Sequence, residues 1–87
     1  MSTKINNFGK FRCPCCGYFT FEIEPNNTFE LCPVCFWEDD GVQLNDPNYE
    51  GGANQVSLIQ ARANFKIYKS SEERFVEFTR NPDYDEL

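Results

Sequence analysis

Cysteine chemistry is the most specific signal in this 87-residue chain, which has five cysteines and no histidine. Four of the cysteines form two C-x2-C pairs, Cys13 with Cys16 and Cys32 with Cys35, and fifteen residues separate the pairs. A two-residue gap lets the backbone form a tight turn, a knuckle, that points both sulfurs at one ion. Zinc is satisfied by four thiolates at about 2.3 Å, which leaves no open position for catalysis. The spacing therefore predicts a zinc ribbon with one structural zinc ion.

The residues around the two pairs agree with this interpretation. Pro14 and Pro33 preset a backbone φ angle near about −65°, which suits a turn. Gly17 follows the first pair and can take a positive φ angle at little cost. Phe36 follows the second pair, where a glycine would be expected. We therefore expect the second knuckle to close differently, with Pro33 opening a short helical turn that residues 38–40 follow.

Cys15 is the odd thiol, and it would point away from the metal if Cys13 and Cys16 bind it. We expect a reduced, partly exposed side chain, with a reactive thiol as the alternative. Disulfides among the paired cysteines are the competing interpretation of the pattern. Residues 1–4 lack a basic segment followed by an apolar run, which argues against secretion into an oxidising compartment. We expect a cytoplasmic protein.

Length and composition predict a single zinc-binding domain spanning residues 1–87, with an ordered core at about 8–80. The chain is 40% hydrophobic and 16% aromatic, close to the size at which a hydrophobic core alone becomes marginal. A structural zinc ion can add on the order of 10 kcal/mol because it binds only the folded state. No apolar run approaches the roughly 20 residues that span a bilayer, so we expect no membrane partner.

The expected architecture is a small α+β fold: a zinc-ribbon-like β-hairpin with two cysteine knuckles, followed by two C-terminal α-helices. Residues 18–23 are rich in strand-forming side chains, and a turn should return the chain along residues 28–31, so that the hairpin brings the knuckles together. Residues 38–54 are polar and turn-rich, and we expect the least ordered stretch there.

The last third of the chain has helical patterns. Ser57 and Gln60 form a capping-box pattern that opens a helix. Its apolar face carries Leu58, Ala61, Phe65 and Tyr68. A second helix should begin near residues 70–73 and end before Pro82, with its Phe75, Val76 and Phe78 side chains supplying core surface. We expect residues 81–87 to form a frayed acidic tail.

Acidic side chains dominate the charge, which is −6 overall. Four thiolates add −4 and zinc adds +2, so the loaded protein would carry about −8 and repel a nucleic-acid backbone. A basic protein is the expected partner, and direct binding to nucleic acid is not. Five carboxylates gather within thirteen residues: Glu38, Asp39, Asp40, Asp46 and Glu50. They predict a solvated interaction loop beside Trp37, with a second metal site or general acid catalysis as alternatives.

Several motifs, in order, closely resemble the bacterial cysteine-rich CPCC domain family over roughly residues 11–80. They are Cys13-Pro14-Cys15-Cys16-Gly17-Tyr18, Cys32-Pro33-Val34-Cys35-Phe36-Trp37-Glu38-Asp39-Asp40-Gly41, Gly51-Gly52-Ala53-Asn54, Ser57-Leu58, Ala61-Arg62 and Glu73-Arg74-Phe75. The resemblance implies a small bacterial intracellular domain, zinc-binding and without an established activity. It also implies the ligand set Cys13, Cys16, Cys32 and Cys35, and it makes Cys15 part of the motif that names the family.

The sequence favours a zinc-stabilised protein-interaction module and not an enzyme. In this interpretation the ribbon presents Trp37, Glu38, Asp39 and Asp40 to a basic partner, and an immunity or antitoxin-like role is a specific version. The alternative is a rubredoxin-like electron carrier, which binds iron with two similar knuckles. Against this alternative, rubredoxins usually separate the knuckles by a longer segment and have glycine after both pairs, whereas Phe36 takes that place here.

Overall fold

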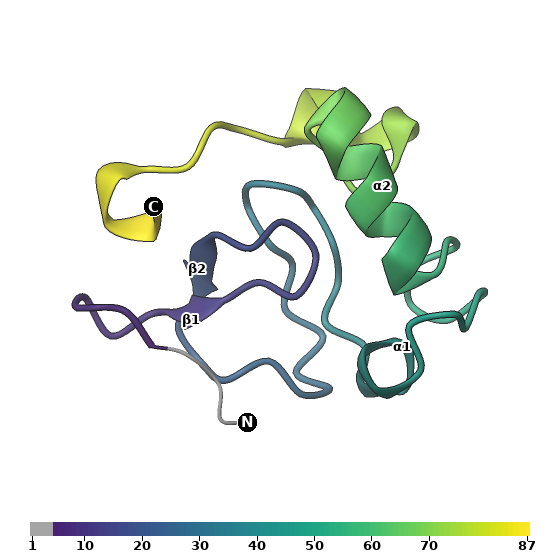
Figure 1. The fold of residues 1–87 in the computed structure, drawn as a ribbon, viewed down its shortest axis with the longest axis horizontal. Helices are drawn as coiled ribbons and strands as arrows, with labels where there is room; N and C mark the ends of the chain where they lie inside the picture. Colours follow the sequence, from purple (N-terminus) through teal and green to yellow (C-terminus); the bar gives the residue numbers. More distant parts are fainter. Residues whose placement is uncertain (1–4) are drawn as a thin grey trace.

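The computed structural model describes residues 5–87, with two cysteine knuckles near one end of the chain and a helical region near the other. Its elements are β1 (Phe11–Arg12), β2 (Phe19–Phe21), α1 (Gly41–Asn45), α2 (Leu58–Tyr68), and the 3-10 helices η1 (Glu73–Phe78) and η2 (Tyr84–Glu86). Figure 1 shows α1 and α2 on one side of the molecule and the C-terminal segment returning toward β2. This is the small α+β, zinc-ribbon-like fold expected from the sequence.

β1 and β2 form an antiparallel pair that encloses the first knuckle. Phe11 lies opposite Phe21 and Arg12 lies opposite Phe19. Thr20 is therefore the extra residue of a β-bulge, a device that bends a strand and redirects a side chain. Its side chain is buried, as is that of Phe21. The bulge places a polar hydroxyl on the inner side of the hairpin.

The strand predicted at residues 18–23 corresponds to β2, but the predicted pairing with residues 28–31 is wrong. That second segment pairs instead across the second knuckle, through a bridge between Leu31 and Glu38. Phe29 has a φ angle of 60°, which interrupts a regular return strand. Each knuckle therefore closes its own short hairpin, because a tight turn brings its flanks together at a lower entropic cost than a longer loop.

A buried polar cluster, which we call the Gln43 network, lies in the segment predicted to be least ordered. Gln43 in α1 is fully buried. Its Nε2 donates to the carbonyls of Tyr49, Asn54 and Val56 at 3.2, 2.9 and 3.1 Å. Its Oε1 accepts from the backbone N and Nδ2 of Asn54, which also pairs with both backbone groups of Glu38. The prediction of a loosely ordered loop is wrong, because internal amides satisfy its main chain.

Asp40 completes the Gln43 network and caps α1. Its Oδ1 accepts from the backbone N of Val42 at 2.8 Å and of Gln43 at 3.3 Å, while its Oδ2 accepts from Ala53 N at 2.8 Å. A Cβ on Gly52 would lie 2.5 Å from that second oxygen, so only glycine fits this approach. The short helical turn expected to begin at Pro33 is only a turn at residues 33–35, and the first helix, α1, begins at Gly41 with Asp40 as its cap.

The predicted helix after Ser57 is confirmed. The Ser57 side chain accepts from Gln60 N at 3.1 Å, and α2 follows directly. Leu58 and Ala61 are fully buried on the face that was predicted to be apolar. The helix ends at Tyr68, and its C-cap Lys69 has a φ angle of 62°, in the left-handed region typical of a helix end.

The second predicted helix is not an α-helix. Its residues form η1, a 3-10 helix that contains no buried residue. Phe78 is 60% exposed and Val76 is 44% exposed, so the prediction that they lie in the core is wrong. Phe75 is half-buried and packs with Phe78 against Phe36, at ring-centroid distances of 4.7 and 5.5 Å from that side chain. Side chains three residues apart lie on the same side of a 3-10 helix, so Phe75 and Phe78 both face Phe36 and remain near the surface.

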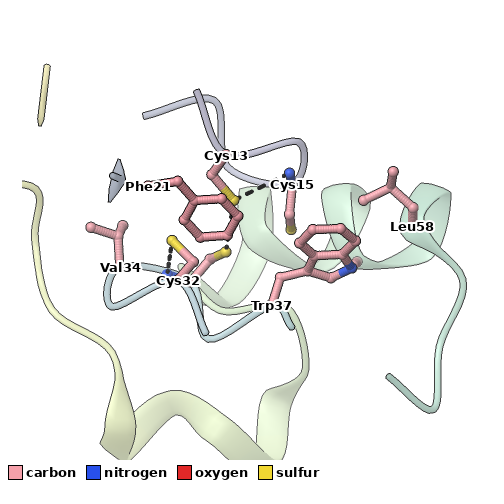
Figure 2. Packing of buried hydrophobic residues seen from close by; sticks show 9 residues of the cluster. Cys13, Cys15, Phe21, Cys32, Val34, Trp37 and Leu58 are labelled. Carbon is pink, nitrogen blue, oxygen red and sulfur yellow. Dashed lines mark hydrogen bonds between the residues drawn. The ribbon is translucent and has the colours of Figure 1, made fainter. Parts of the chain in front are cut away.

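The buried core is small and rich in sulfur (Figure 2). Its members are Cys13, Cys15, Phe21, Cys32, Val34, Cys35, Trp37, Leu58 and Ala61. Trp37 and Leu58 are the largest fully buried apolar side chains. Four of these nine residues are cysteines, so much of the interior depends on how the sulfurs are held.

Candidate metal centre

The first knuckle is closed by two backbone hydrogen bonds. Cys13 N donates to Tyr18 O at 2.8 Å, and Gly17 N donates to Cys13 O at 2.9 Å. Gly17 has a φ angle of 84°, the left-handed conformation that its sequence position predicted. The turn therefore returns the chain to β2 immediately after the second cysteine of the pair.

The second knuckle is closed by the equivalent bonds. Cys32 N donates to Trp37 O at 2.9 Å, and Phe36 N donates to Cys32 O at 2.7 Å. Phe36 has a φ angle of 69°, so it adopts the conformation that Gly17 adopts in the first knuckle. The expectation that this knuckle closes differently is wrong. A left-handed residue with a side chain costs about 1–2 kcal/mol, and here the ring of Phe36 gains contacts with η1.

The two knuckles bring the four predicted ligand sulfurs together. The sulfur atoms of Cys13, Cys16, Cys32 and Cys35 all lie within 4.8 Å of one another. Two of the separations are 3.7 Å, from Cys13 to Cys35, and 3.8 Å, from Cys16 to Cys32. A tetrahedron with metal–sulfur bonds of about 2.3 Å has edges of about 3.8 Å. The cysteines are positioned to hold a metal ion, and three of the four are fully buried.

Polar groups around the sulfurs support the charge that metal binding requires. Cys15 N donates to the sulfur of Cys13 at 3.4 Å, and Cys35 N donates to that of Cys32 at 3.5 Å. The hydroxyl of Thr20 lies 3.1 Å from the same Cys32 sulfur. Sequence reasoning missed Thr20, because its role depends on the bulge in β2 and on contact between the two hairpins. Donors of this kind orient metal ligands and stabilise their negative charge.

The crowded thiols have strongly shifted pKa values when no cation neutralises them. Burial raises the pKa of Cys13, and the hydrogen bond with Cys13 raises that of Cys35. The pKa of Cys32 is lowered, because Cys13 and the other nearby thiols donate to its sulfur and Thr20 adds a further donor. A bound divalent cation deprotonates coordinating thiols outright. The cluster is thus costly as four bare thiolates and stable around a cation.

Cys15 lies outside the four-sulfur group, and its side chain is not partly exposed as the sequence suggested. Its residue is only 7% exposed, and it belongs to the buried core. Figure 2 shows the Cys15 side chain on the side of the cluster where Trp37 and Leu58 lie. All five cysteines are free thiols, so the disulfide alternative has no support in this geometry.

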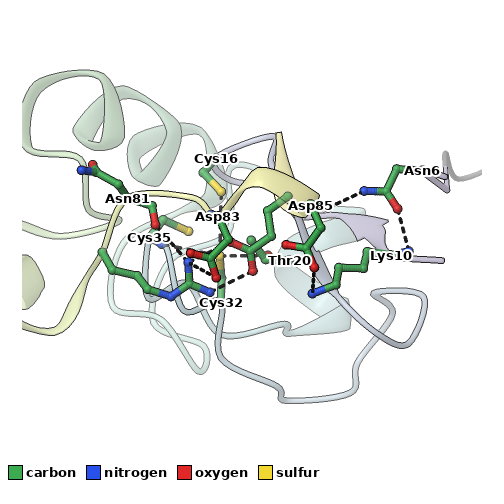
Figure 3. Close-up of polar contacts among 11 residues, drawn as sticks. Asn6, Lys10, Cys16, Thr20, Cys32, Cys35, Asn81, Asp83 and Asp85 are labelled. Atoms are coloured by element: carbon green, nitrogen blue, oxygen red, sulfur yellow. Dashed lines mark hydrogen bonds and ion pairs between the residues drawn. The ribbon is translucent and has the colours of Figure 1, made fainter. Parts of the chain in front are cut away.

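The C-terminal tail lies against the β-hairpin and is not frayed as predicted (Figure 3). Arg80 makes two hydrogen bonds of 2.8 Å with the carboxylate of Glu86, which is almost fully buried. Lys10 pairs with Asp85 at 3.3 Å. The bond with Glu86 raises the pKa of Arg80, and the nearby charge of Cys32 adds to the shift. The tail thus brings a guanidinium close to the sulfur centre.

The interaction surface predicted at Trp37, Glu38, Asp39 and Asp40 is wrong. Trp37 and Asp39 are fully buried, and Asp40 is 7% exposed. Asp39 accepts from the backbone N and the hydroxyl of Thr28 at 2.9 and 2.8 Å, while Asp40 belongs to the Gln43 network. Glu38 is half-buried and contributes its backbone to that network. The carboxylates of Asp39 and Asp40 accept hydrogen bonds from the protein's own backbone, so these two side chains do not belong to a solvated loop.

The two knuckles, the hairpin across each of them and the following helix define a small cysteine-rich domain of the zinc-ribbon-like class. Residues 11–86 match the family described as cysteine-rich CPCC, and the chain belongs to that family. No curated protein matches the chain. Within residues 5–87, no helix has both the length and the apolar character needed to cross a membrane.

Proposed function

We propose that this chain is a zinc-stabilised protein-interaction module, in which one zinc ion bound by Cys13, Cys16, Cys32 and Cys35 holds the domain together. The observation that carries the proposal is the four-sulfur cluster, in which two sulfur–sulfur separations match the edges of a tetrahedral metal site. Four thiolates complete the coordination of zinc and leave no position for a reacting water. The ion is therefore structural and not catalytic.

The arrangement of the acidic segment supports a non-catalytic role. Asp39 and Asp40 use their carboxylates to accept hydrogen bonds from the protein's own backbone. Asp40 has a pKa below its ordinary value, chiefly because Ala53 N donates to it, so it stays ionised as a structural acceptor. A general acid needs the opposite shift, toward neutral pH.

The partner that fits this module is a basic protein in the bacterial cytoplasm. The net charge of −6 supports electrostatic steering of a basic surface, and the five free thiols suit a reducing compartment. An immunity or antitoxin-like role, in which the domain masks a basic nucleic-acid-directed protein, is a specific version. The same charge disfavours direct contact with nucleic acid.

A second candidate, a rubredoxin-like iron electron carrier, is favoured by one observation. Phe36 adopts the left-handed conformation that a glycine would adopt, so the two knuckles close alike despite the different sequence. Four thiolates in a tetrahedron accept iron as well as zinc. The nature of the bound ion separates the two candidates.

The deciding experiment is native mass spectrometry on protein purified without added metal, together with an absorption spectrum and a count of reactive thiols. The proposed function predicts one zinc ion per chain and no visible absorption. Iron retained under zinc-replete expression, with thiolate-to-iron absorption, would favour the electron carrier instead. A folded protein that holds no metal at all would contradict both candidates.

A further inference from the structure

A surface groove lies between the two knuckle hairpins, on the side of β2 that leads toward residues 22–23. It has a volume of about 300 Å³. Its lining residues are Thr20, Phe21, Glu22, Ile23, Glu30 and Leu31. One wall belongs to the hairpin of the first knuckle and the other to the hairpin of the second, so the groove exists only while the two hairpins are held together.

Unpaired backbone groups line both walls. Leu31 faces Glu38 in a bridge flanked by the bonds Cys32 N to Trp37 O and Asp39 N to Glu30 O. In this antiparallel arrangement the middle residue points its own N–H and C=O away from its partner strand. The backbone groups of Leu31 are therefore turned away from the second knuckle's hairpin and have no partner among residues 5–87.

The other wall has the same property. Ile23 lies two residues beyond the end of β2, in a bend, and its backbone groups likewise have no partner within the described chain. Ile23 is 62% exposed and Leu31 is 47% exposed, so each wall also offers an apolar side chain. An exposed edge with free backbone groups and apolar side chains is a template for an added strand.

Charge indicates what kind of strand fits. Glu22 and Glu30 are exposed, stand on opposite walls, and form no ion pair within residues 5–87. No basic side chain lines the groove. A strand with lysine or arginine at alternate positions would place its cations beside these carboxylates and its apolar side chains against Ile23 and Leu31.

We propose that this groove binds an extended, lysine- or arginine-containing peptide segment of a protein partner, which adds as a strand to the wall formed by Leu31. The inference rests on the proposed function, because the metal centre holds the walls together and the partner is a basic protein. The groove is accessible to a partner, whereas the interaction surface predicted around Trp37 is buried.

The test is selection from a random heptapeptide library on the metal-loaded, full-length protein, followed by amide chemical-shift mapping of the recovered peptides. The proposal predicts basic residues alternating with apolar ones, and shifts concentrated at residues 20–23 and 30–31. It is overturned if no peptide is enriched, if the enriched peptides are not basic, or if the shifts map elsewhere, for instance to Phe36 and η1.

Two double variants distinguish peptide binding in the groove from nonspecific attraction to the protein's negative charge. The double change Glu22→Gln with Glu30→Gln should weaken the best peptide about three- to tenfold at low salt, as expected for two exposed ion pairs. The matched control, Glu73→Gln with Glu77→Gln, removes the same charge from exposed positions on η1, outside the groove. Equal weakening by both double variants would overturn the groove assignment.

A modified peptide tests strand addition itself. In an added strand, alternate backbone N–H groups of the peptide point toward the groove wall. Methylating those nitrogens removes the donors to the wall, whereas methylating the nitrogens between them leaves these donors in place. One pattern should weaken binding by roughly tenfold or more and the other should not. Equal binding of both methylated peptides would exclude an added strand. If the protein binds one zinc ion but these peptide tests fail, only the assignment of the groove as a binding site is refuted. If the protein binds iron or no metal, the proposed function is refuted.

Discussion

The sulfur centre and the Gln43 network are both buried polar clusters, but they are completed in different ways. Gln43 and Asn54 satisfy each other and the surrounding carbonyls with donors and acceptors that the chain itself supplies. The sulfur centre brings together four groups that repel one another when ionised. The first cluster is complete on folding, whereas the second needs an ion from outside the chain.

This difference shows how a domain of 87 residues can be stable with a core of few large apolar side chains. Trp37 lies between the two clusters in the sequence, where its carbonyl closes the second knuckle and its side chain is fully buried in the core. One cluster fixes the knuckles and the other fixes the segment between α1 and α2. Removing each in turn tests whether the two act independently.

Loss of the metal should have the largest effect. Cys32→Ser removes a ligand and the acceptor of the Thr20 hydroxyl, so metal binding should be lost, along with stabilisation on the order of 10 kcal/mol. That loss is comparable to the total stability of a small domain, and we expect an unfolded hairpin region by circular dichroism and amide NMR. Cys15→Ala is the control, because Cys15 is outside the four-sulfur group, and it should retain one ion. A natively folded, metal-free Cys32→Ser protein would refute this dependence.

Breaking the Gln43 network should have the next largest effect. Gln43→Ala leaves several buried backbone groups without partners, and we expect a loss of about 3–4 kcal/mol in the free energy of unfolding, measured in urea. The metal content should stay at one ion, because no ligand is touched. Gln55→Ala, at an exposed position, is the matched control. A loss of unfolding free energy below about 1 kcal/mol would mean that water molecules satisfy these backbone groups in place of Gln43.

The two clusters also differ in how far the sequence predicts them. Ligands within a knuckle are three residues apart, so spacing alone identifies the sulfur centre. The Gln43 network joins residues eleven positions apart, and no local pattern distinguishes its buried Gln43 and Asn54 from the side chains of a solvated loop. The Gly51-Gly52-Ala53-Asn54 motif carries part of the family resemblance, but nothing in it predicts a contact with Asp40. The structure shows that Gly52 allows the chain to approach Asp40.

Other errors have the same physical origin. The strand partner of β2 was misassigned because the knuckle itself is the hairpin turn, a fact that strand propensity does not encode. Phe36 was expected to change the second knuckle, but packing against Phe75 and Phe78 stabilises a conformation that intrinsic preference disfavours. In the first case a local turn decides the strand pairing, and in the second a tertiary contact overrides a local preference.

The smallest effect, and the sharpest comparison, concerns the pH dependence of the Gln43 network. Hydrogen bonds from Ala53 N and from the start of α1 hold the pKa of Asp40 below its usual value. A lowered folded pKa means that the carboxylate stabilises the fold fully above the unfolded pKa of about 3.9 and progressively loses this effect as pH falls through the folded pKa. Asp40→Asn keeps an oxygen that can cap α1 but turns an NH2 group toward Ala53 N, so the loss of this charged acceptor should cost about 1–2 kcal/mol at pH 7 and less below pH 4.

The measurement is the difference in unfolding free energy between the wild type and Asp40→Asn, from urea titrations at several pH values with metal present. Thiol protonation weakens the sulfur centre in acid, but it acts on both proteins and cancels in the difference. Glu50→Gln makes the same chemical change at an exposed position, and its difference should stay flat. If the Asp40→Asn difference were equally independent of pH, the ionised carboxylate would not stabilise the Gln43 network. The contrast with the ion-dependent sulfur centre would then depend only on the hydrogen bonds of the Gln43 and Asn54 amides.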